Sequence, residues 1–236
     1  MSTASVFETL AAEISALRGS PLVAIDGVDG SGKTTFAKSL TAQLNARTAI
    51  VIHVDDFLNP PEIRHRRGRQ SPEGFWLDSY DYDALERHVL DPLGRGGSRR
   101  YRQRRDSDAY LHAADGAIVL VEGLFLHRDE LAERWDYSIF LDAPFEETAR
   151  RMNLRDGTNA DPDHPSMNRY VGGRRLYFAD VSPWTRADLV IDKFEPRESR
   201  PCRNYHPLHV QRAVEVQSTG VRSDMLRVDE RQEHLP

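Results

Sequence analysis

The stretch AIDGVDGSGKTTFAKSL, residues 24–40, matches the pattern G-x-x-x-x-G-K-[ST] at every fixed position. The apolar run PLVAID comes before it, and apolar residues with helical spacing come after it. Between a strand and a helix, a glycine-rich turn can point backbone N–H groups at phosphate oxygens, and the helix start adds favourable partial charge. We therefore expect a nucleotide-binding loop that consists of Gly27, Asp29, Gly30, Ser31, Gly32, Lys33, Thr34 and Thr35.

Two side chains of this loop are expected to take part in chemistry. Lys33 can reach the β- and γ-phosphates of a nucleotide, and the Thr34 hydroxyl can complete the shell of a Mg²⁺ ion. Lysine is rare in this chain, since only Lys38 and Lys193 accompany Lys33.

Strand-like and helix-like segments alternate on both sides of the loop. Helices are expected at 3–18, from the loop to about 46, at 80–92, at 129–135 and at 144–157, and strands at 21–26, 48–56, 116–126, 137–144 and 187–192. This alternation is typical of βαβ units and predicts an α/β fold with a central parallel sheet.

Acidic residues stand at the ends of two predicted strands. HVDD places Asp55 and Asp56 at the end of the second strand, and IVLVEG places Glu122 at the end of the third. Carboxyl ends of parallel strands form the edge where ligands bind in such folds. One aspartate can take a proton from an attacking hydroxyl or hold Mg²⁺ through water, and the Glu122 carboxylate can contact the hydration shell of the metal ion. Helix capping or a solvated turn is the alternative for Asp55 and Asp56, and an ordinary acid at a strand end is the alternative for Glu122.

For Asp81 and the arginine runs, the sequence allows more than one role. Asp81 in DSYDYDAL can cap a helix or contact a substrate, with about equal support for each. Arginine runs at 64–69, 99–105, 150–155 and 174–175 are usually solvated surfaces, but arginines beside a phosphate site can clamp the transferring group. We favour the clamping role for the run at 150–155 only.

The composition argues against several classes of protein. The 236 residues carry a net charge of −5, which argues against a general nucleic-acid binder. No run of about 18 apolar residues is present, so a membrane-spanning helix is not expected. A single cysteine, Cys202, and the absence of a basic, apolar leader suit a cytoplasmic protein.

In this order, the motifs resemble those of the uridine kinase and phosphoribulokinase-like family, which includes bacterial pantothenate kinases. The resemblance runs from about residue 21 to 192, through GVDGSGKTT, HVDDFL, GFWLDSYDYDAL, IVLVEGLFLH, ARRMNLRD and RYVGGRRLYF. It implies a P-loop NTPase three-layer sandwich with a helical lid that transfers the ATP γ-phosphate to a small metabolite, with Mg²⁺.

The resemblance also implies roles for single residues. Asp55 matches the carboxylate beside the acceptor hydroxyl, Asp81 a second acceptor contact and Glu122 the metal-side acid. Phe57 and Tyr101 are expected at the acceptor site. Arg150, Arg151 and Arg155 match lid arginines, and among them Arg151 and Arg155, four residues apart, are the expected catalytic pair.

We predict a kinase domain at 1–194 with a lid at about 150–178, and a polar tail at 195–236. A nucleoside such as uridine or cytidine is the first expected acceptor, and pantothenate is the alternative, because NPPEIRHRRGRQSPEG (59–74) departs from typical uridine kinases. A P-loop switch is the rival of another class, but the chain lacks its base-reading motif N-K-x-D. Whether the chain forms a homo-oligomer stays open.

Overall fold

The computed structural model describes residues 3–192 and 200–201. Five parallel strands form its central sheet in the order β2-β5-β1-β6-β7, and a short strand, β8, pairs antiparallel with β7. The strands are β1 (Leu22–Gly27), β2 (Ala49–His53), β5 (Ile118–Gly123), β6 (Tyr137–Asp142), β7 (Leu189–Asp192) and β8 (Arg200–Pro201). Strand β1 is central, and the order reverses there, so the loop that follows it opens at the crevice where ligands bind in α/β sheets.

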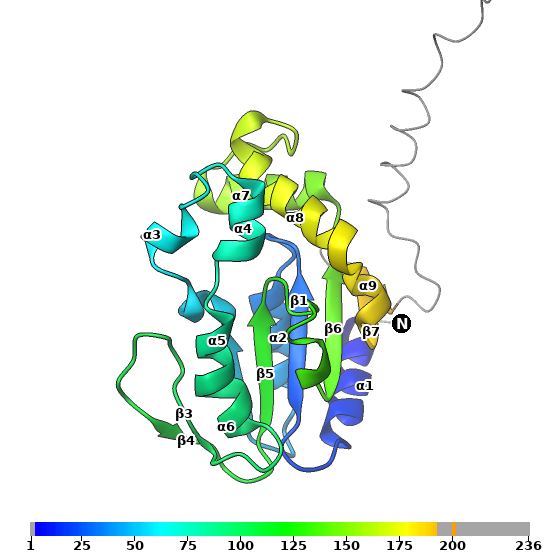
Figure 1. Ribbon diagram of the computed structural model, residues 1–236. Coiled ribbons are helices and arrows are strands. Elements are labelled where there is room, and N and C mark those ends of the chain that lie inside the picture. The colour runs from blue at the N-terminus through cyan, green and yellow to red at the C-terminus, as the bar shows by residue number, and fades with distance from the viewer. Residues whose placement is uncertain (1–2, 193–199, 202–236) are drawn as a thin grey trace, which may run out of the picture. The chain divides into compact units, whose positions relative to one another are not determined.

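Helices cover both faces of the sheet and make a three-layer sandwich (Figure 1). Alternate residues of β1 point to opposite faces, as the period of a strand requires. Val23 and Ile25 pack against α1 (Thr3–Ser15) and α2 (Lys33–Thr41). Leu22 and Ala24 belong to the cluster on the other face, which contains residues of α4 (Pro72–Asp78), α5 (Tyr82–Leu85), the π-helix Glu86–Leu90, α6 (Asp91–Leu93) and α8 (Asn168–Val181).

The segment predicted as a lid lies over the carboxyl edge of the sheet, with α4, α7 and α8 above the strand ends (Figure 1). Helix α7 (Phe145–Asp156) follows Pro144 and ends at Gly157, which adopts a left-handed conformation. A loop and the 3₁₀ turn Pro165–Met167 then lead into α8. Within this segment, Ala149, Met152, Met167 and Val171 form a small apolar cluster of their own.

Smaller elements complete the described part. They are the 3₁₀ turns Val54–Phe57 and Ala132–Arg134, the short helices α3 (Pro61–Arg64) and α9 (Pro183–Arg186), and the hairpin of β3 (Arg100–Tyr101) with β4 (Leu111–His112). No helix among the described residues is long and apolar enough to cross a membrane.

The α/β fold and its parallel sheet are confirmed, whereas several boundaries differ from the prediction. The strand predicted to run to 56 ends at His53, and the one predicted to run to 126 ends at Gly123. The pattern at 168–181 was read only as a motif, but it forms α8, whose buried face is too weakly periodic to stand out. Of the predicted tail at 195–236, only Arg200 and Pro201 lie within the described residues.

A buried carboxylate holds the carboxyl edge together. Asp26 is fully buried and accepts hydrogen bonds from the backbone N–H of Gly27 (2.7 Å) and from the N–H groups of residues 125–127 (3.0–3.3 Å). The Tyr177 hydroxyl donates to it at 2.5 Å, and His127 Nδ1 lies 2.9 Å away. Burial alone would raise the pKa of Asp26, but the contacts with His127 and Tyr177 hold that pKa below its ordinary value. One side chain thus joins β1, the loop after β5 and α8.

Substitution of Asp26 by asparagine should destabilise the fold. The amide keeps the size but replaces one acceptor oxygen with a donor, so a buried donor would lose its partner at a cost on the order of 1–3 kcal/mol. Urea unfolding measures this as a lower midpoint with an unchanged slope. The exposed Asp180→Asn is the matched control and should stay within about 0.5 kcal/mol. Equal stability of both variants would contradict the role of the buried carboxylate.

The same variant should change how stability depends on pH. Because the folded-state pKa of Asp26 lies below the ordinary 3.8, its stabilisation is present above about pH 4 and is lost as pH falls through the folded-state value. The stability difference between the native chain and Asp26→Asn should therefore be constant from neutral pH to about pH 5 and shrink on further acidification. A stability difference that grows as the pH falls would contradict this role of the Asp26 carboxylate.

Candidate active site

The loop after β1 is built on glycines that no other residue could replace without strain. Gly30 has φ +72°, and a Cβ there would lie 2.8 Å from the carbonyl oxygen of Thr148 in α7. A Cβ on Gly27 would lie 2.6 Å from the carbonyl oxygen of Leu141 in β6. The loop is thus pressed between β6 and α7, and its compact path into the start of α2 at Lys33 depends on glycine.

Lys33 lies across this loop. Its Nζ donates to the carbonyl oxygens of Gly27 (3.1 Å) and Val28 (3.0 Å). Desolvation by burial, together with the positive charge of Arg174, lowers the pKa of the Lys33 ammonium, and the carboxylates of Asp29 and Glu122 act in the opposite direction. Among the described residues, the hydrogen-bond partners of this ammonium group are these two carbonyl oxygens, which leaves it able to bind an anion.

Two more groups suit a phosphate at the loop, one within it and one from α8. The Ser31 hydroxyl is buried and has no hydrogen-bond partner among the described residues, so it is a donor at the loop without an acceptor. Arg174 of α8, only 2% exposed, donates to the Gly27 carbonyl (3.1 Å) and pairs with Asp29 at 2.5 Å. Thr35 is exposed on the first turn of α2. Arg174 was interpreted as part of a solvated run; its place in GGRRLY, in the quoted motif, was the available signal.

A carboxylate corner adjoins the loop. The Thr34 hydroxyl donates to Glu122 Oε1 at 2.8 Å, so the structure brings together the two residues predicted to share Mg²⁺. His53 Nδ1 lies 2.6 Å from the same oxygen, because His53 and Glu122 are paired in the register of β2 and β5. Sequence reasoning missed His53, although it stands two residues before Asp55 in the quoted HVDD. Mg²⁺ keeps several waters and uses few protein oxygens, and Thr34 with Glu122 fits that requirement.

The two aspartates after β2 lie in the 3₁₀ turn Val54–Phe57, not on an extended strand. Asp55 is exposed, and its Oδ1 accepts a hydrogen bond from the Tyr80 hydroxyl at 2.9 Å. Asp56 has a different partner, Arg104, whose Nε lies 3.4 Å from its Oδ1. A 3₁₀ helix has three residues per turn, so the side chains of adjacent residues point in directions about 120° apart. The Asp55 and Asp56 carboxylates therefore point in different directions, as the strand prediction also required.

Tyr80 contacts the candidate site, although the sequence analysis assigned it no role. It lies directly before Asp81 in the quoted DSYDYDAL. It is 6% exposed, and burial and the Asp55 charge raise its pKa well above the ordinary value, so the phenol stays protonated and donates. Asp81 caps α5: its side chain accepts from Ala84 N at 2.9 Å, and its other oxygen lies 3.9 Å from Arg105. In this structure Asp81 is therefore a helix cap, which is one of the two roles that the sequence left open.

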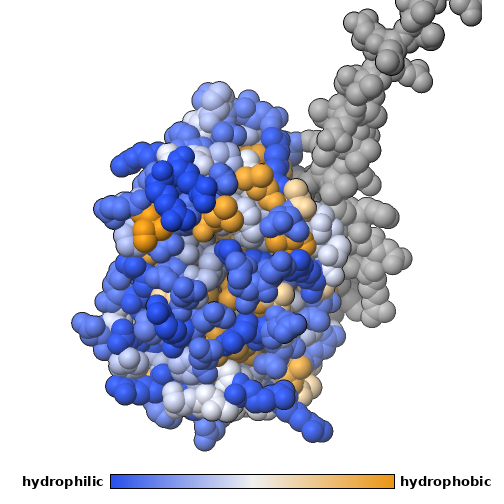
Figure 2. All heavy atoms as spheres, viewed as in Figure 1, coloured by the Kyte–Doolittle hydropathy of each residue, from blue (hydrophilic) through white to orange (hydrophobic). Residues whose placement is uncertain are grey.

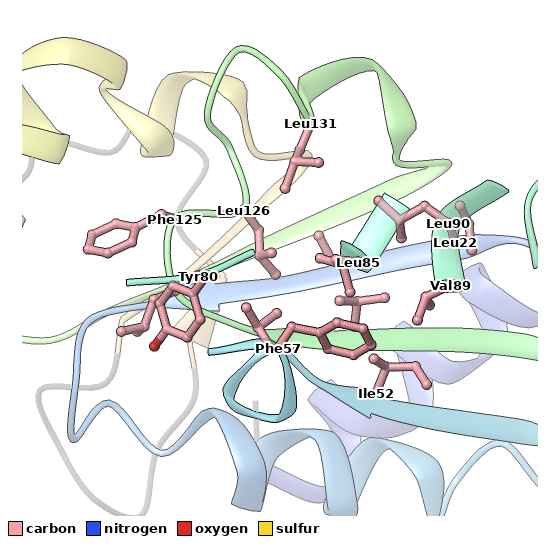
Figure 3. Close-up of a cluster of buried hydrophobic side chains, with 14 of the residues drawn as sticks. Leu22, Ile52, Phe57, Tyr80, Leu85, Val89, Leu90, Phe125, Leu126 and Leu131 are labelled. Carbon is pink, nitrogen blue, oxygen red and sulfur yellow. The ribbon is translucent and has the colours of Figure 1, made fainter. Parts of the chain in front are cut away.

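Two residues predicted at the acceptor site are buried in the apolar core. Phe57 is fully buried and packs in the apolar cluster with Ile52, Leu85 and Val89, as Figure 3 shows. Tyr101 of β3 is also buried in that cluster. The 3₁₀ turn directs Phe57 into the core, where it anchors the turn that carries Asp55.

The lid arginines differ in their surroundings. Arg151 Nη1 donates to the carbonyl oxygen of Gly30 at 3.2 Å, and its Nε pairs with Glu147 at 2.7 Å, so it contacts the phosphate loop. Arg150 pairs with the same Glu147 at 2.8 Å. Arg155 is 66% exposed and pairs with Asp156; its pKa is raised mainly by that hydrogen bond, and further by the charges of Asp29 and Asp55. Arg151 is thus in contact with the loop, whereas Arg155 is influenced by Asp29 and Asp55 only through their charges.

Comparison with known proteins agrees with this geometry. The family model described as AAA domain (AAA_18) matches residues 23–171. The chain is 25% identical to uridine kinase of Saccharomyces cerevisiae over 88% of its own length, but spans only 43% of the yeast protein. It is 34% identical to nicotinamide riboside kinase 1 of Mus musculus, over 60% of this chain and 69% of that one.

Among solved structures, the fold is similar to that of a possible uridine kinase from Bacillus stearothermophilus. The TM-score is 0.59 at 22% identity, and the match covers 81% of this chain and 98% of the other. The parallel sheet, the glycine loop between β1 and α2 and the family match agree with one another. The chain belongs to the AAA domain family (AAA_18) and, by its relatives and fold, to the uridine kinase and phosphoribulokinase-like P-loop kinases.

Proposed function

We propose that this protein is an ATP- and Mg²⁺-dependent kinase that transfers the γ-phosphate to a hydroxyl group of a small, nucleoside-like metabolite. The observation that carries the proposal is that the Lys33 loop, the Thr34–Glu122 pair and the exposed carboxylate of Asp55 all lie at the carboxyl edge of one sheet. Phosphoryl transfer needs mainly positioning and charge stabilisation, and these groups can supply both.

Each group has a role that follows from its surroundings. Lys33, with Arg151 near the Gly30 carbonyl, stabilises the charge that develops on the transferring group. Asp55 accepts the proton of the acceptor hydroxyl, and the Tyr80 hydroxyl holds that carboxylate in place. Thr34 and Glu122 would hold Mg²⁺, which supplies neutralisation of phosphate charge when bound.

The acceptor is proposed from the relatives. The relatives include a uridine kinase and a nicotinamide riboside kinase, and the acceptors in both names are nucleosides. The alternative, a pantothenate kinase, is supported by one relative that is 29% identical over 60% of this chain. A P-loop switch is disfavoured, because a switch needs no carboxylate facing an acceptor.

A screen for ADP release tests the proposal. Purified protein would be incubated with ATP and Mg²⁺ and, in turn, with nucleosides, nicotinamide riboside, pantothenate and ribose derivatives. ADP release with at least one acceptor should rise well above the rate without acceptor. A rate that no acceptor raises would contradict the proposed kinase and favour a switch.

The base assignment predicts unequal effects at neighbouring positions. Asp55→Asn keeps the shape and removes the base, so transfer should fall by roughly 10²–10⁴-fold while ATP still binds. Asp56→Asn, the matched control, should have a much smaller effect, because Asp56 pairs with Arg104 instead. ATP affinity and acceptor phosphorylation would be measured for both. Loss of transfer in Asp56→Asn alone would refute the assignment.

The metal assignment predicts a change in magnesium dependence. Glu122→Gln can still accept the Thr34 hydrogen bond but loses the negative charge, so half-maximal activity should need roughly 10–100-fold more Mg²⁺. Activity would be followed across a Mg²⁺ titration, with the exposed Glu133→Gln as control. An unchanged titration curve for Glu122→Gln, or full activity in excess chelator, would place the metal elsewhere.

The two predicted lid arginines should also differ. Arg151→Gln removes a cation in contact with the loop, and removal of such a group costs roughly 10²–10³ in rate when it stabilises the transition state. Arg155→Gln, whose cation pairs with Asp156, should lower the rate less. Steady-state rates with saturating ATP make the comparison. If both variants match the native rate, these arginines form only a solvated surface of α7.

A further inference from the structure

A group of basic side chains lies beside the acceptor end of the site. We define the basic cluster as Arg64, His65, Arg69 and Arg169. Residues 61–78 carry four arginines and three carboxylates, and Arg169 from α8 joins them, so this region is positive in a chain whose net charge is −5. Figure 2 shows strongly hydrophilic residues gathered over this part of the molecule, where α3 and the start of α4 lie in Figure 1.

Of the three carboxylates at 61–78, Asp78 and Glu73 pair with other arginines, and Glu62 is exposed. Asp78 is buried and pairs with Arg66 and, at 2.9 Å, with Arg67. Glu73 lies 3.3 Å from Arg67 as well. Within the part of the chain that the structure describes, no carboxylate lies at ion-pair distance from Arg64, Arg69 or Arg169. The positive charge of the cluster is therefore not neutralised there.

Buried polar atoms of the cluster also lack partners. Arg64 Nε and His65 Nδ1 are buried without a hydrogen-bond partner among the described residues. Arg169 is only 8% exposed; its Nη1 donates to the Arg69 carbonyl oxygen at 3.2 Å, and its guanidinium lies 5.3 Å from the Phe75 ring. Burial and the charges of the three arginines lower the pKa of His65, so an additional proton is disfavoured. Groups of this kind are costly unless a ligand satisfies them.

The cluster is close to the proposed acceptor site. Arg169 interacts electrostatically with Tyr80 and Asp78, and the Tyr80 hydroxyl donates directly to Asp55. Helix α4, which follows the cluster in the chain, packs along α8, which carries Arg169. A small molecule with a hydroxyl at Asp55 can therefore extend from Tyr80 toward the cluster.

We infer that the basic cluster binds an anionic group, a carboxylate or a phosphate, on the acceptor molecule. The inference rests on the proposed kinase function and changes the expected acceptor from an uncharged nucleoside such as uridine to a hydroxylated anion such as orotidine or pantothenate. Planar guanidinium groups suit both kinds of anion. The rival occupant is the triphosphate of the nucleotide, but the loop has its own cations for that purpose in Lys33, Arg151 and Arg174.

Pairs of acceptors that differ by one charged group test the inference. We would compare uridine with orotidine and panthenol with pantothenate for the carboxylate, and ribose with ribose 5-phosphate for the phosphate. For each pair the ratio of kcat/KM, anionic over neutral, would be measured in the native chain, Arg64→Gln and Arg169→Gln. Arg95→Gln, an exposed arginine outside the cluster, is the control.

The native chain should prefer the anionic member of at least one pair by roughly tenfold or more, as expected for a charge-assisted hydrogen bond. Arg64→Gln and Arg169→Gln should each lower that ratio by about tenfold, and Arg95→Gln should leave it unchanged. Equal use of both members of every pair would overturn the inference. So would variants that raise the KM for ATP and leave the ratio as it was, since this would assign the cluster to the nucleotide.

A binding measurement separates this inference from the kinase proposal. With a non-hydrolysable ATP analogue in the phosphate loop, calorimetry would measure binding of orotidine, pantothenate and inorganic phosphate. Binding that Arg64→Gln and Arg169→Gln weaken, without phosphoryl transfer, would support the anion site and contradict the kinase. Absence of arginine-dependent binding of every probe would overturn the anion site, whatever the transfer assay gives.

Discussion

The buried carboxylate of Asp26 is the interaction on which the carboxyl edge of the sheet depends. It sits at the end of the central strand, directly before the first glycine of the phosphate loop. Its two oxygens accept hydrogen bonds from the backbone N–H groups of Gly27 and residues 125–127 and from the hydroxyl of Tyr177. The start of the loop, the segment after Glu122 and the helix that carries Arg169 and Arg174 are therefore positioned by one group. A charge without water around it is tolerable there because so many donors satisfy it.

Cationic and acidic side chains lie on different sides of the candidate site. Lys33, Arg151 and Arg174 meet at the loop carbonyls, which suits the phosphates of a nucleotide. Glu122 and Asp55 lie at the ends of neighbouring strands β5 and β2 and suit a metal ion and a hydroxyl group. The separation of cations from carboxylates follows from strand order: the loop follows the central strand, and both acids lie on the same side of it.

The sequence was sufficient for the fold and for most residues of the loop, because their patterns are local. The motif, the buried strands and the α7 boundaries at Pro144 and Gly157 depend on neighbours in the chain. What it missed depends on distant contacts. Tyr80 reaches Asp55 across 25 positions, His53 meets Glu122 through strand register, and Arg174 reaches Gly27 across 147 positions. The burial of Phe57 and Tyr101 was not predicted for the same reason, since only packing decides which aromatic rings enter the core.

The central claim is that these groups move a phosphoryl group from ATP to a hydroxyl oxygen, and phosphorus NMR tests it most directly. A reaction of the native chain with ATP, Mg²⁺ and a mixture of hydroxylated acceptors would be followed through time. The account predicts a new phosphomonoester resonance that grows in step with ADP and is absent when the acceptors are left out. Formation of ADP with inorganic phosphate alone, or ATP that stays intact with every acceptor present, would contradict it.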